Sequence, residues 1–409
     1  MDNNSKKTLW YLHPYAGGPK IGPAFRPYYF CKEFSKNNIV PVIISSSWHH
    51  LMYDKGKPLE NKMVDGINYI FIKTNSYYSN GFNRICNMFG YTIKLLFNKK
   101  LKDNYRPHII IVSSPHLFTF ISAYILSKRY NAKLILEIRD IWPLSLIDIV
   151  GVSSKHPFIS LLSIIEKFAY RRSHYIVTLF NNGKRYFQNF GVKEDSIVYI
   201  PNGSVLKSNI QNIDDDEIIN YIKARKDNGD FIIGYTGAHG TPNALKQLLE
   251  SIVILKASHI DKFHVIMVGD GIEKETLIEF SNKNNLKNIT FFDSVDKSRI
   301  EPIIKEFDLC YIASLKKNIY QYGVSPNKLF EYMRARRPIL SSIYLDTIVE
   351  NAECGIVANC ENPEHLALKI KYFLNMERSK LEKMGNSGFE YLLKNHDIKK
   401  LAKNYMQLF

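Results

Sequence analysis

One segment in the second half of the chain, residues 322–333, carries residue types that could bind a diphosphate. Ser325 or Asn327 can cap a helix there, and Lys328 falls in the first turn of that helix. A helix N-terminus presents free N–H groups and a partial positive charge, to which Lys328 adds a full one. Glu331, one turn further on, could accept hydrogen bonds from ribose hydroxyls. The alternative is a capped surface helix with a solvated Lys–Glu pair.

Two glycine-rich loops follow predicted strands. Residues 233–243 read Ile-Gly-Tyr-Thr-Gly-Ala-His-Gly-Thr-Pro-Asn, and residues 15–22 read Tyr-Ala-Gly-Gly-Pro-Lys-Ile-Gly. Glycine has no Cβ, so its backbone can approach a phosphate closely. The loop at 15–22 has G-G-x3-G spacing instead of G-x-G-x-x-G, which argues against a dehydrogenase. A plain strand-to-helix turn is the alternative for the loop at 233–243.

Charged residues end a predicted apolar strand at Leu134–Ile138. Glu137, Arg139 and Asp140 lie at its carboxyl end, where open α/β sheets bind ligands. Burying such charges is costly unless they are paired or face a cleft. We expect Asp140 first, and Glu137 second, to be a catalytic or ligand-binding group; the alternative is a structural ion pair between Glu137 and Arg139. His116, after another predicted strand, is a further candidate of this kind, although a lone histidine more often packs in a core.

These residues must be positioned by a repeated strand–helix pattern. Apolar runs without polar alternation are typical of parallel strands buried on both faces. The predicted strands are Leu9–Leu12, Val40–Ile44, Ile67–Ile72, His108–Val112, Lys133–Ile138, Tyr175–Thr178, Ile197–Ile200, Phe231–Tyr235, His264–Val268, Ile289–Phe292, Leu309–Ile312, Ile339–Ser342 and Gly355–Ala358. Pro201-Asn202-Gly203 and a polar, acidic stretch interrupt the pattern. Two Rossmann-like doubly wound halves facing a cleft are therefore expected.

Composition narrows the class of protein further. The chain has 409 residues, 45% of them hydrophobic, which predicts two globular domains. Its formal net charge of +16 lies almost wholly in residues 1–200, which hold 27 Lys and Arg against 12 Asp and Glu. Such a field attracts anionic lipid or nucleic acid. The five cysteines form no C-x-x-C pair, no apolar run is long enough to span a bilayer, and no signal peptide is seen, so a cytoplasmic location is expected.

The segment 322–333, Tyr-Gly-Val-Ser-Pro-Asn-Lys-Leu-Phe-Glu-Tyr-Met, resembles the donor-site helix of the retaining family 4 glycosyltransferases, which have the GT-B fold. More narrowly, it resembles a branch with a G-x-S-P-x-K-L-F-E pattern that builds bacterial surface polysaccharides, either O-antigen or capsule. Most of the family has two glutamates eight positions apart; Glu331 matches the second, and Gly323 stands in place of the first. Residues 137–143, Glu-Ile-Arg-Asp-Ile-Trp-Pro, resemble the same branch, with Arg139-Asp140 where many members have His-Asp.

The resemblance implies roles for individual residues. The glycine loop at 233–243 and Lys328 would hold the diphosphate, and Lys328 would also stabilise the leaving group. The nucleoside would lie near Asp270, and the loop at 15–22 would lie near the donor phosphate and the acceptor. The implied donor-side residues are Gly18, Gly237, Ala238, His239, Gly240, Asp270, Ser294, Val295, Gly323, Val324, Ser325, Asn327, Lys328 and Glu331. The acceptor-side residues are Arg26, His116 and Arg139, beside the catalytic candidates Asp140 and Glu137.

The same resemblance implies a reaction and a domain plan. A hexosyl or N-acetylhexosaminyl group would pass, with retention and without a metal or other cofactor, from a nucleoside diphosphate-sugar, with UDP favoured, to a polyprenyl diphosphate-linked saccharide. We expect an acceptor-binding domain at 1–205, a linker at 206–230 and a nucleotide-sugar-binding domain at 231–374. Helices at 375–409 would follow, with the option of packing back on the first domain.

Two basic amphipathic stretches, residues 81–101 and 156–175, could lie in an anionic membrane interface, or could equally cover their own sheet. The basic first half favours a peripheral protein at the inner face of the cell membrane. Two other functions stay open. A nucleotide-sugar epimerase of the same fold would release UDP without any acceptor, whereas a transferase would need one. A nucleic-acid-binding protein would use the basic first half, but no recognisable binding module is present.

Overall fold

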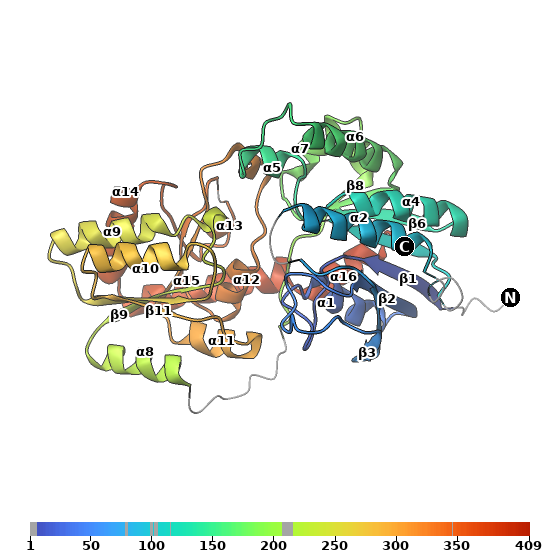
Figure 1. Ribbon diagram of the computed structural model, residues 1–409. Coiled ribbons are helices and arrows are strands. Elements are labelled where there is room, and N and C mark those ends of the chain that lie inside the picture. The colour runs from blue at the N-terminus through green and yellow to red at the C-terminus, as the bar shows by residue number, and fades with distance from the viewer. Residues whose placement is uncertain are drawn as a thin grey trace. The chain divides into compact units, whose positions relative to one another are not determined.

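The computed structural model describes residues 6–77, 81–98, 101, 105–114, 116–206, 216–345 and 347–409. The chain folds into two compact units (Figure 1). The first contains residues 1–202 and 398–409, and the second contains residues 203–397. Lys99 and Lys100, of the predicted basic stretch 81–101, and Asp214, of the expected linker 206–230, lie outside the described residues.

The first unit is built on an eight-stranded sheet in the order β3-β4-β2-β1-β5-β6-β7-β8. All its neighbouring strands are parallel except β3, which pairs antiparallel with β4. The strands are β1 (Lys7–Leu12), β2 (Ile39–Ser46), β3 (Lys62–Val64), β4 (Ile67–Ile72), β5 (Ile109–Ser113), β6 (Lys133–Ile138), β7 (Tyr175–Thr178) and β8 (Ile197–Tyr199). Because both faces of the central strands are covered, β1, β5 and β6 are buried along most of their length.

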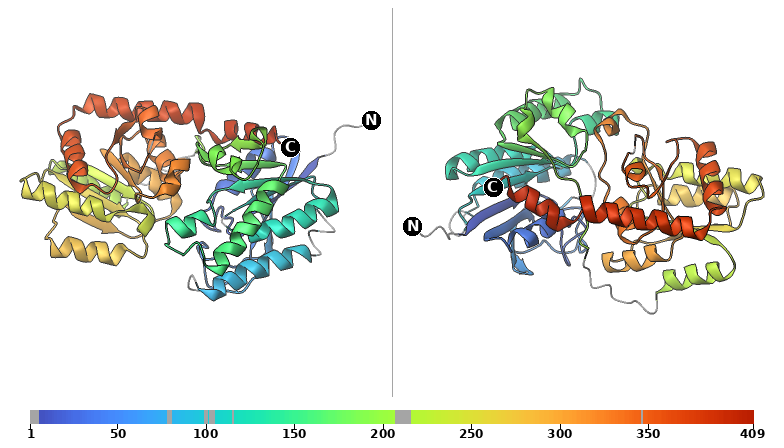
Figure 2. Two further views of the ribbon diagram at one scale, coloured as in Figure 1. Left: turned by 90° about the horizontal axis from the view of Figure 1, so that it is seen from above. Right: turned by 180° about the vertical axis from the view of Figure 1, so that it is seen from behind.

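Helices cover both faces of this sheet (Figure 2). The helices are α1 (Arg26–Phe34), α2 (Phe82–Leu96), α4 (Phe118–Tyr130), α5 (Leu144–Asp148), α6 (Pro157–Arg172), α7 (Gly183–Gln188), the 3₁₀ turn η1 (Glu194–Ser196) and α16 (Ile398–Met406). On one face α4 packs between α2 and α6; on the other, α16 packs on α1. The α1–α16 contact is aromatic, with ring centroids of Tyr405 at 5.4 Å from Phe30 and 5.7 Å from Phe34.

The second unit has a six-stranded, fully parallel sheet in the order β11-β10-β9-β12-β13-β14. Its strands are β9 (Phe231–Thr236), β10 (Phe263–Val268), β11 (Ile289–Phe292), β12 (Leu309–Ala313), β13 (Ile339–Ser342) and β14 (Gly355–Val357). Its helices are α8 (Glu217–Asp227), η2 (Thr241–Asn243), α9 (Lys246–Ala257), α10 (Lys274–Lys283), α11 (Lys297–Lys305), η3 (Asn318–Tyr322), α12 (Asn327–Arg334), α13 (Ile348–Asn351), α14 (Pro363–Leu374) and α15 (Arg378–Asn395). Apolar clusters lie on both faces of this sheet.

The predicted fold class, two doubly wound parallel-sheet α/β domains with C-terminal helices, is confirmed. Every predicted strand is present within two residues of its expected bounds, and β3 is an additional one. The expected linker at 206–230 contains α8. This helix begins at Asp216, whose carboxylate accepts hydrogen bonds from the N–H groups of Ile218 and Ile219, and it buries Ile222 in the second unit's core. Of the C-terminal helices, α15 belongs to the second unit and α16 to the first.

No helix in the described part of the chain is both long and apolar enough to cross a membrane.

Candidate active site

In both units the strand order reverses direction beside the first strand, between β1 and β5 and between β9 and β12. Open α/β sheets bind ligands in the crevice at the carboxyl ends of such strands. In the second unit, this point brings together the loop after β9, which contains Gly237–Gly240, and the segment after β12, which leads into α12. The donor-side candidates at 237–240 and 323–331 therefore flank one switch point.

The loops after β9 and β10 interlock because their glycines allow the backbones to touch. Gly237 N–H donates to the carbonyl of Val268, and His239 N–H donates to the carbonyl of Asp270. A Cβ on Gly269 would lie 1.9 Å from the carbonyl oxygen of Gly237, so only glycine fits there. The glycines at 269 and 271 thus have a packing function.

Lys328 points at this glycine loop from the first turn of α12. Its Nζ donates hydrogen bonds to Tyr235 Oη (2.6 Å) and Asn243 Oδ1 (2.8 Å), and it lies 4.2 Å from the centroid of the Tyr235 ring. A Cβ placed on Gly237 would lie 3.2 Å from Nζ. Burial lowers the pKa of Lys328 to about 7. Sequence reasoning assigned no role to Tyr235 or Asn243, because neither residue type is a signal without its distance to Lys328.

The start of α12 differs from its expected form. Its N-cap residue is Pro326, which has no side-chain hydrogen bond to offer, so the predicted N-cap position at Ser325 or Asn327 is wrong by one residue. Proline has no N–H group and a fixed φ, and both suit a helix start. Gly323 has φ +102°, a backbone conformation that favours glycine, so a glutamate at this position would be strained. The backbone conformation at residue 323 therefore explains why a glycine, and not the first of the two glutamates, stands there.

Glu331 lies further along α12, and its carboxylate forms an ion pair with Lys297 Nζ of α11 at 3.1 Å. This pair holds the carboxylate in place while leaving its second oxygen for other partners. Val324 packs against the core beside it. The alternative of a surface pair between Lys328 and Glu331 is therefore not what is found, since Glu331 pairs with Lys297 of α11.

The other donor-side candidates lie at the same edge of the sheet. The Asp270 carboxylate, after β10, accepts the N–H of Gly271 at 2.8 Å. After β11, Ser294 is exposed and Val295 packs on the core. In the loop after β9, Ala238 is exposed and Gly240 is half-buried.

His239 is fully buried within the loop after β9. Neither of its ring nitrogens has a hydrogen-bond partner among the described residues. Burial, together with the charges of Lys274 and Lys328, lowers the pKa of His239 to about 4, so the imidazole is neutral.

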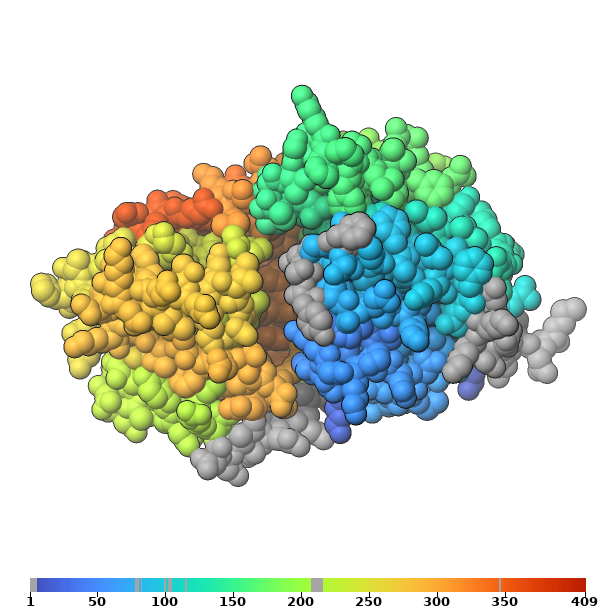
Figure 3. Space-filling model, in the orientation of Figure 1, coloured from blue at the N-terminus to red at the C-terminus, as the bar shows by residue number. Residues whose placement is uncertain are grey.

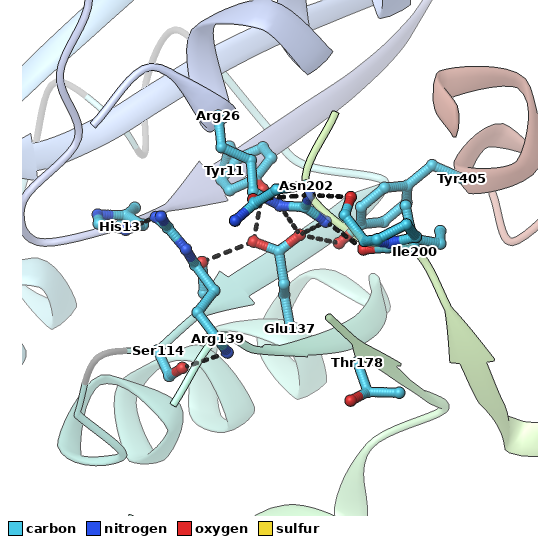
Figure 4. A network of polar contacts seen from close by, with 12 residues as sticks. Tyr11, His13, Arg26, Ser114, Glu137, Arg139, Thr178, Ile200, Asn202 and Tyr405 are labelled. Atoms are coloured by element: carbon cyan, nitrogen blue, oxygen red, sulfur yellow. Dashed lines mark hydrogen bonds and ion pairs between the residues drawn. The ribbon is translucent and has the colours of Figure 1, made fainter. Parts of the chain in front are cut away.

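In the first unit, Glu137 is the centre of a buried network (Figure 4). Its Oε2 accepts hydrogen bonds from Arg26 Nε (3.0 Å) and Nη2 (2.9 Å) and from Tyr405 Oη (3.3 Å). Its Oε1 accepts Tyr11 Oη at 2.8 Å and Ser113 Oγ at 2.7 Å. Burial alone would raise the pKa of Glu137, but the charge and hydrogen bonds of Arg26 outweigh it and hold the pKa below its usual value.

Arg26 uses all of its guanidinium N–H groups inside this network. Besides Glu137, it donates to the carbonyls of Ile200 (2.8 Å) and Pro201 (2.6 Å) and to Asn202 Oδ1 (3.3 Å). The expected structural ion pair of Glu137 therefore exists, with Arg26 as its partner in place of Arg139. In this geometry Arg26 and Glu137 hold the fold, which leaves neither a free group for a phosphate or an acceptor.

Arg139 and Asp140 emerge from β6 beside this network. The backbone N–H groups of both donate to Ser114 Oγ, at 2.8 and 3.3 Å. Arg139 Nη1 lies 2.7 Å from His13 Nε2, and Asp140 Oδ2 accepts Trp142 Nε1 at 3.0 Å. Burial raises the pKa of Asp140. Of the two catalytic candidates in this unit, Asp140 is the one that forms no ion pair with a described residue, whereas both carboxylate oxygens of Glu137 are taken up by the network.

Gly18 and His116 lie at the ends of β1 and β5. Gly18 has φ +150° and bonds to Gly22, and a Cβ there would lie 2.6 Å from the hydroxyl oxygen of Tyr69. The glycine loop at 15–22 is therefore packed against the sheet. His116 is buried. Among the described residues, no group of three or more His, Cys, Asp or Glu side chains is arranged to hold a metal ion.

Glu137→Gln should destabilise the first unit strongly, because it leaves the Arg26 guanidinium buried without a counter-charge. We expect a loss of about 3–5 kcal/mol, which corresponds to roughly 6–20 °C in the melting transition of that unit. Glu33→Gln is the control, since it breaks a pair with Lys36, whose side chain is 54% exposed. Its effect should stay below about 1 kcal/mol. Equal melting temperatures for the two variants would contradict the structural role of Glu137.

Residues 230–376 match the family model described as glycosyl transferases group 1. A sequence search of curated proteins finds no match. The fold of the whole chain is similar to sucrose-phosphate synthase from Thermosynechococcus elongatus, with a TM-score of 0.75, 13% identity and 98% of each chain covered. It is also similar to HepE from Anabaena in complex with UDP and glucose, with a TM-score of 0.70, 13% identity and 98% of each chain covered.

A third similar structure is WaaG, a glycosyltransferase involved in lipopolysaccharide biosynthesis. Its TM-score is 0.68 at 12% identity, with 98% of this chain and 99% of that chain covered. At such low identities the likeness establishes the fold alone. This chain therefore has the GT-B fold, and its second unit contains a group 1 glycosyl transferase domain.

Proposed function

We propose that this chain is a retaining family 4 glycosyltransferase that acts in bacterial surface polysaccharide synthesis. It transfers a hexosyl or N-acetylhexosaminyl group from a UDP-sugar to a polyprenyl diphosphate-linked saccharide. The observation that carries the proposal is the half-buried amine of Lys328, which faces the Gly237 loop at the switch point of a group 1 glycosyl transferase domain. The Anabaena protein of the same fold, HepE, is described in complex with UDP and glucose.

The donor site suits a diphosphate for three reasons. The loop after β9 exposes backbone at Gly237 and Ala238, and α12 begins beside it with free N–H groups. Lys328 is held by the neutral partners Tyr235 and Asn243, so its charge is not neutralised. A diphosphate would supply the counter-charge that the amine lacks.

In the proposed reaction, an acceptor hydroxyl oxygen forms a bond with the anomeric carbon. The bond from that carbon to the diphosphate oxygen breaks, and its electron pair stays on UDP. Lys328 and the N-terminus of α12 stabilise the charge that develops there. Asp140 is the candidate to accept the hydroxyl proton, because burial raises its pKa and so makes the carboxylate a stronger base. No metal is assigned to this step.

The first unit is proposed to rest on an anionic membrane surface. Its helices α2, α4 and α6 pack side by side, and Figure 3 shows α6 in green at the upper edge of the unit. Large apolar side chains are exposed along them, including Phe97 (69%) and Ile164 (68%). Lys167, Arg171 and Arg172 are exposed on α6. Apolar side chains with basic neighbours are typical of interfacial helices.

UDP should raise the melting temperature of the protein without added metal, and Lys328→Ala should abolish the rise. At about a hundred times its dissociation constant, a ligand adds roughly 2.7 kcal/mol of stability. The control is Lys246→Ala, which removes an exposed amine of α9 in the same unit. GDP, TDP, CMP and NAD form the comparison panel. A shift with NAD alone, or with no nucleotide, would refute the donor site.

UDP binding at pH 8 should take up a large fraction of a proton. Free Lys328 is mostly neutral at this pH because its pKa is about 7, and a bound diphosphate raises that pKa. UDP affinity should therefore fall as the pH rises above 7. Calorimetry in two buffers of different ionisation enthalpy measures the uptake. Wild-type protein without any buffer dependence would contradict the assignment.

Ile164→Ser and Leu161→Ser should weaken binding to phosphatidylglycerol vesicles while leaving the melting temperature nearly unchanged, because both side chains are exposed on α6. Leu368→Ser on α14 of the second unit, also exposed, is the matched control. Vesicle sedimentation at low and high salt is the measurement. If Ile164→Ser and Leu161→Ser bind vesicles like the wild type, or if the wild type itself does not bind, the membrane surface is not α6.

A further inference from the structure

Four aromatic side chains of the first unit gather at the carboxyl ends of neighbouring strands. Tyr15 follows β1, His49 and His50 follow β2, and His116 follows β5. Since β2, β1 and β5 are adjacent in the sheet, these four residues share one edge and flank the switch point between β1 and β5. We call them the histidine cluster. Of these four residues, only His116 is a candidate site residue on the sequence alone.

Tyr15 is the centre of the cluster. The centroid of its ring lies 5.0 Å from that of His50, 5.8 Å from that of His49 and 6.0 Å from that of His116. The guanidinium carbon of Arg84, from the start of α2, lies over the same ring at 5.8 Å. Side chains from three loops and one helix therefore meet at a single point.

Two histidines of the cluster lack the hydrogen bonds that buried imidazoles normally make. His49 is 0% and His116 1% exposed; neither ring nitrogen of His116 has a partner among the described residues, and His49 has only a weak contact with the backbone of Ala16. Two other histidines each have a partner for at least one ring nitrogen. His174 Nδ1 accepts the N–H of Leu134 at 2.9 Å, and His264 Nε2 lies 2.8 Å from Thr290 Oγ1. A buried, unpaired polar group is destabilising unless a ligand pairs with it.

The charges around the cluster are positive. Burial lowers the pKa of His49 and His116 to about 3 and that of His50 to about 4, so all three are neutral. The charged side chains that act on these three histidines are Arg84 and Lys55, and no carboxylate is among them in the described part of the chain. A neutral imidazole still offers one N–H donor.

We propose that the histidine cluster binds a phosphate-class anion. Arg84 supplies the positive charge, and the imidazole N–H groups of His49 and His116 donate hydrogen bonds to the anion's oxygens. If the proposed function holds, the anion is the diphosphate of the lipid-linked acceptor. The cluster then fixes the acceptor by its phosphate, separately from the donor site in the second unit.

The test is calorimetric titration of the full chain with inorganic pyrophosphate while UDP saturates the donor site. The same titration is repeated with Lys328→Ala. In that variant the donor site should not take up pyrophosphate, even if UDP does not bind there. We expect pyrophosphate to bind, and His116→Phe and Arg84→Gln each to weaken it at least tenfold without changing UDP affinity. Lys94→Gln, which removes an exposed charge from the same helix as Arg84, should have no effect.

His116→Phe also separates a binding role from a packing role. It removes two unpaired buried nitrogens and keeps a ring, so its melting temperature should equal or exceed that of the wild type. If the variant folds poorly, Arg84→Gln, at a half-buried position, carries the test. Retained pyrophosphate affinity in both variants, or no binding by the wild type, would overturn the proposal.

Two further ligands identify the source of the phosphate. Inorganic phosphate represents the free ion, and farnesyl diphosphate represents a lipid-linked diphosphate. If farnesyl diphosphate binds more tightly than pyrophosphate and loses that affinity in His116→Phe, the anion belongs to a lipid-linked acceptor. If inorganic phosphate binds as tightly as both and is equally sensitive to His116→Phe, the cluster is a site for free phosphate.

Discussion

The buried ion pair between Arg26 and Glu137 is the interaction on which the first unit depends. A charge inside a protein is tolerated only when its partner is present and all remaining donors and acceptors are satisfied. Here that requirement draws in β1, β5, β6, α1, residues 200–202 and α16, because each contributes an atom to the network. Segments 268 residues apart in the chain, Glu137 and Tyr405, thereby meet on one carboxylate.

The same network holds the chain where it leaves the first unit. Arg26 bonds to Ile200, Pro201 and Asn202, the last residues before the second unit begins. Within the second unit, Ser204 N–H donates to the carbonyl of His396, next to the point where the chain returns. Arg26 thus anchors the chain where it leaves the first unit, and the hydrogen bond between the backbones of Ser204 and His396 anchors it within the second.

The two units share several structural features at their switch points. Each has a glycine-rich loop after its first strand, and each buries a histidine whose ring nitrogens lack partners among the described residues, His239 in one and His116 in the other. Each also brings a cation close to an aromatic ring, Lys328 at Tyr235 and Arg84 at Tyr15. Buried ring nitrogens without hydrogen-bond partners cost stability, which is reasonable where an anion is to be bound.

From the sequence alone the strands, their parallel arrangement and the glycine-rich loops after them could be predicted, because buried parallel strands read as continuous apolar runs and glycine turns are local signals. It missed α8, since a polar stretch hid the apolar face of Ile218, Ile219 and Ile222. Only the tertiary structure decided which charges pair. Glu137 has Arg139 two residues away but pairs with Arg26, 111 positions distant, because α1 places the Arg26 guanidinium against the carboxylate, whereas Arg139 lies beyond the end of β6 and its guanidinium contacts His13. The histidine cluster, assembled from three loops, has no trace in local sequence for the same reason: its members meet only through the strand order.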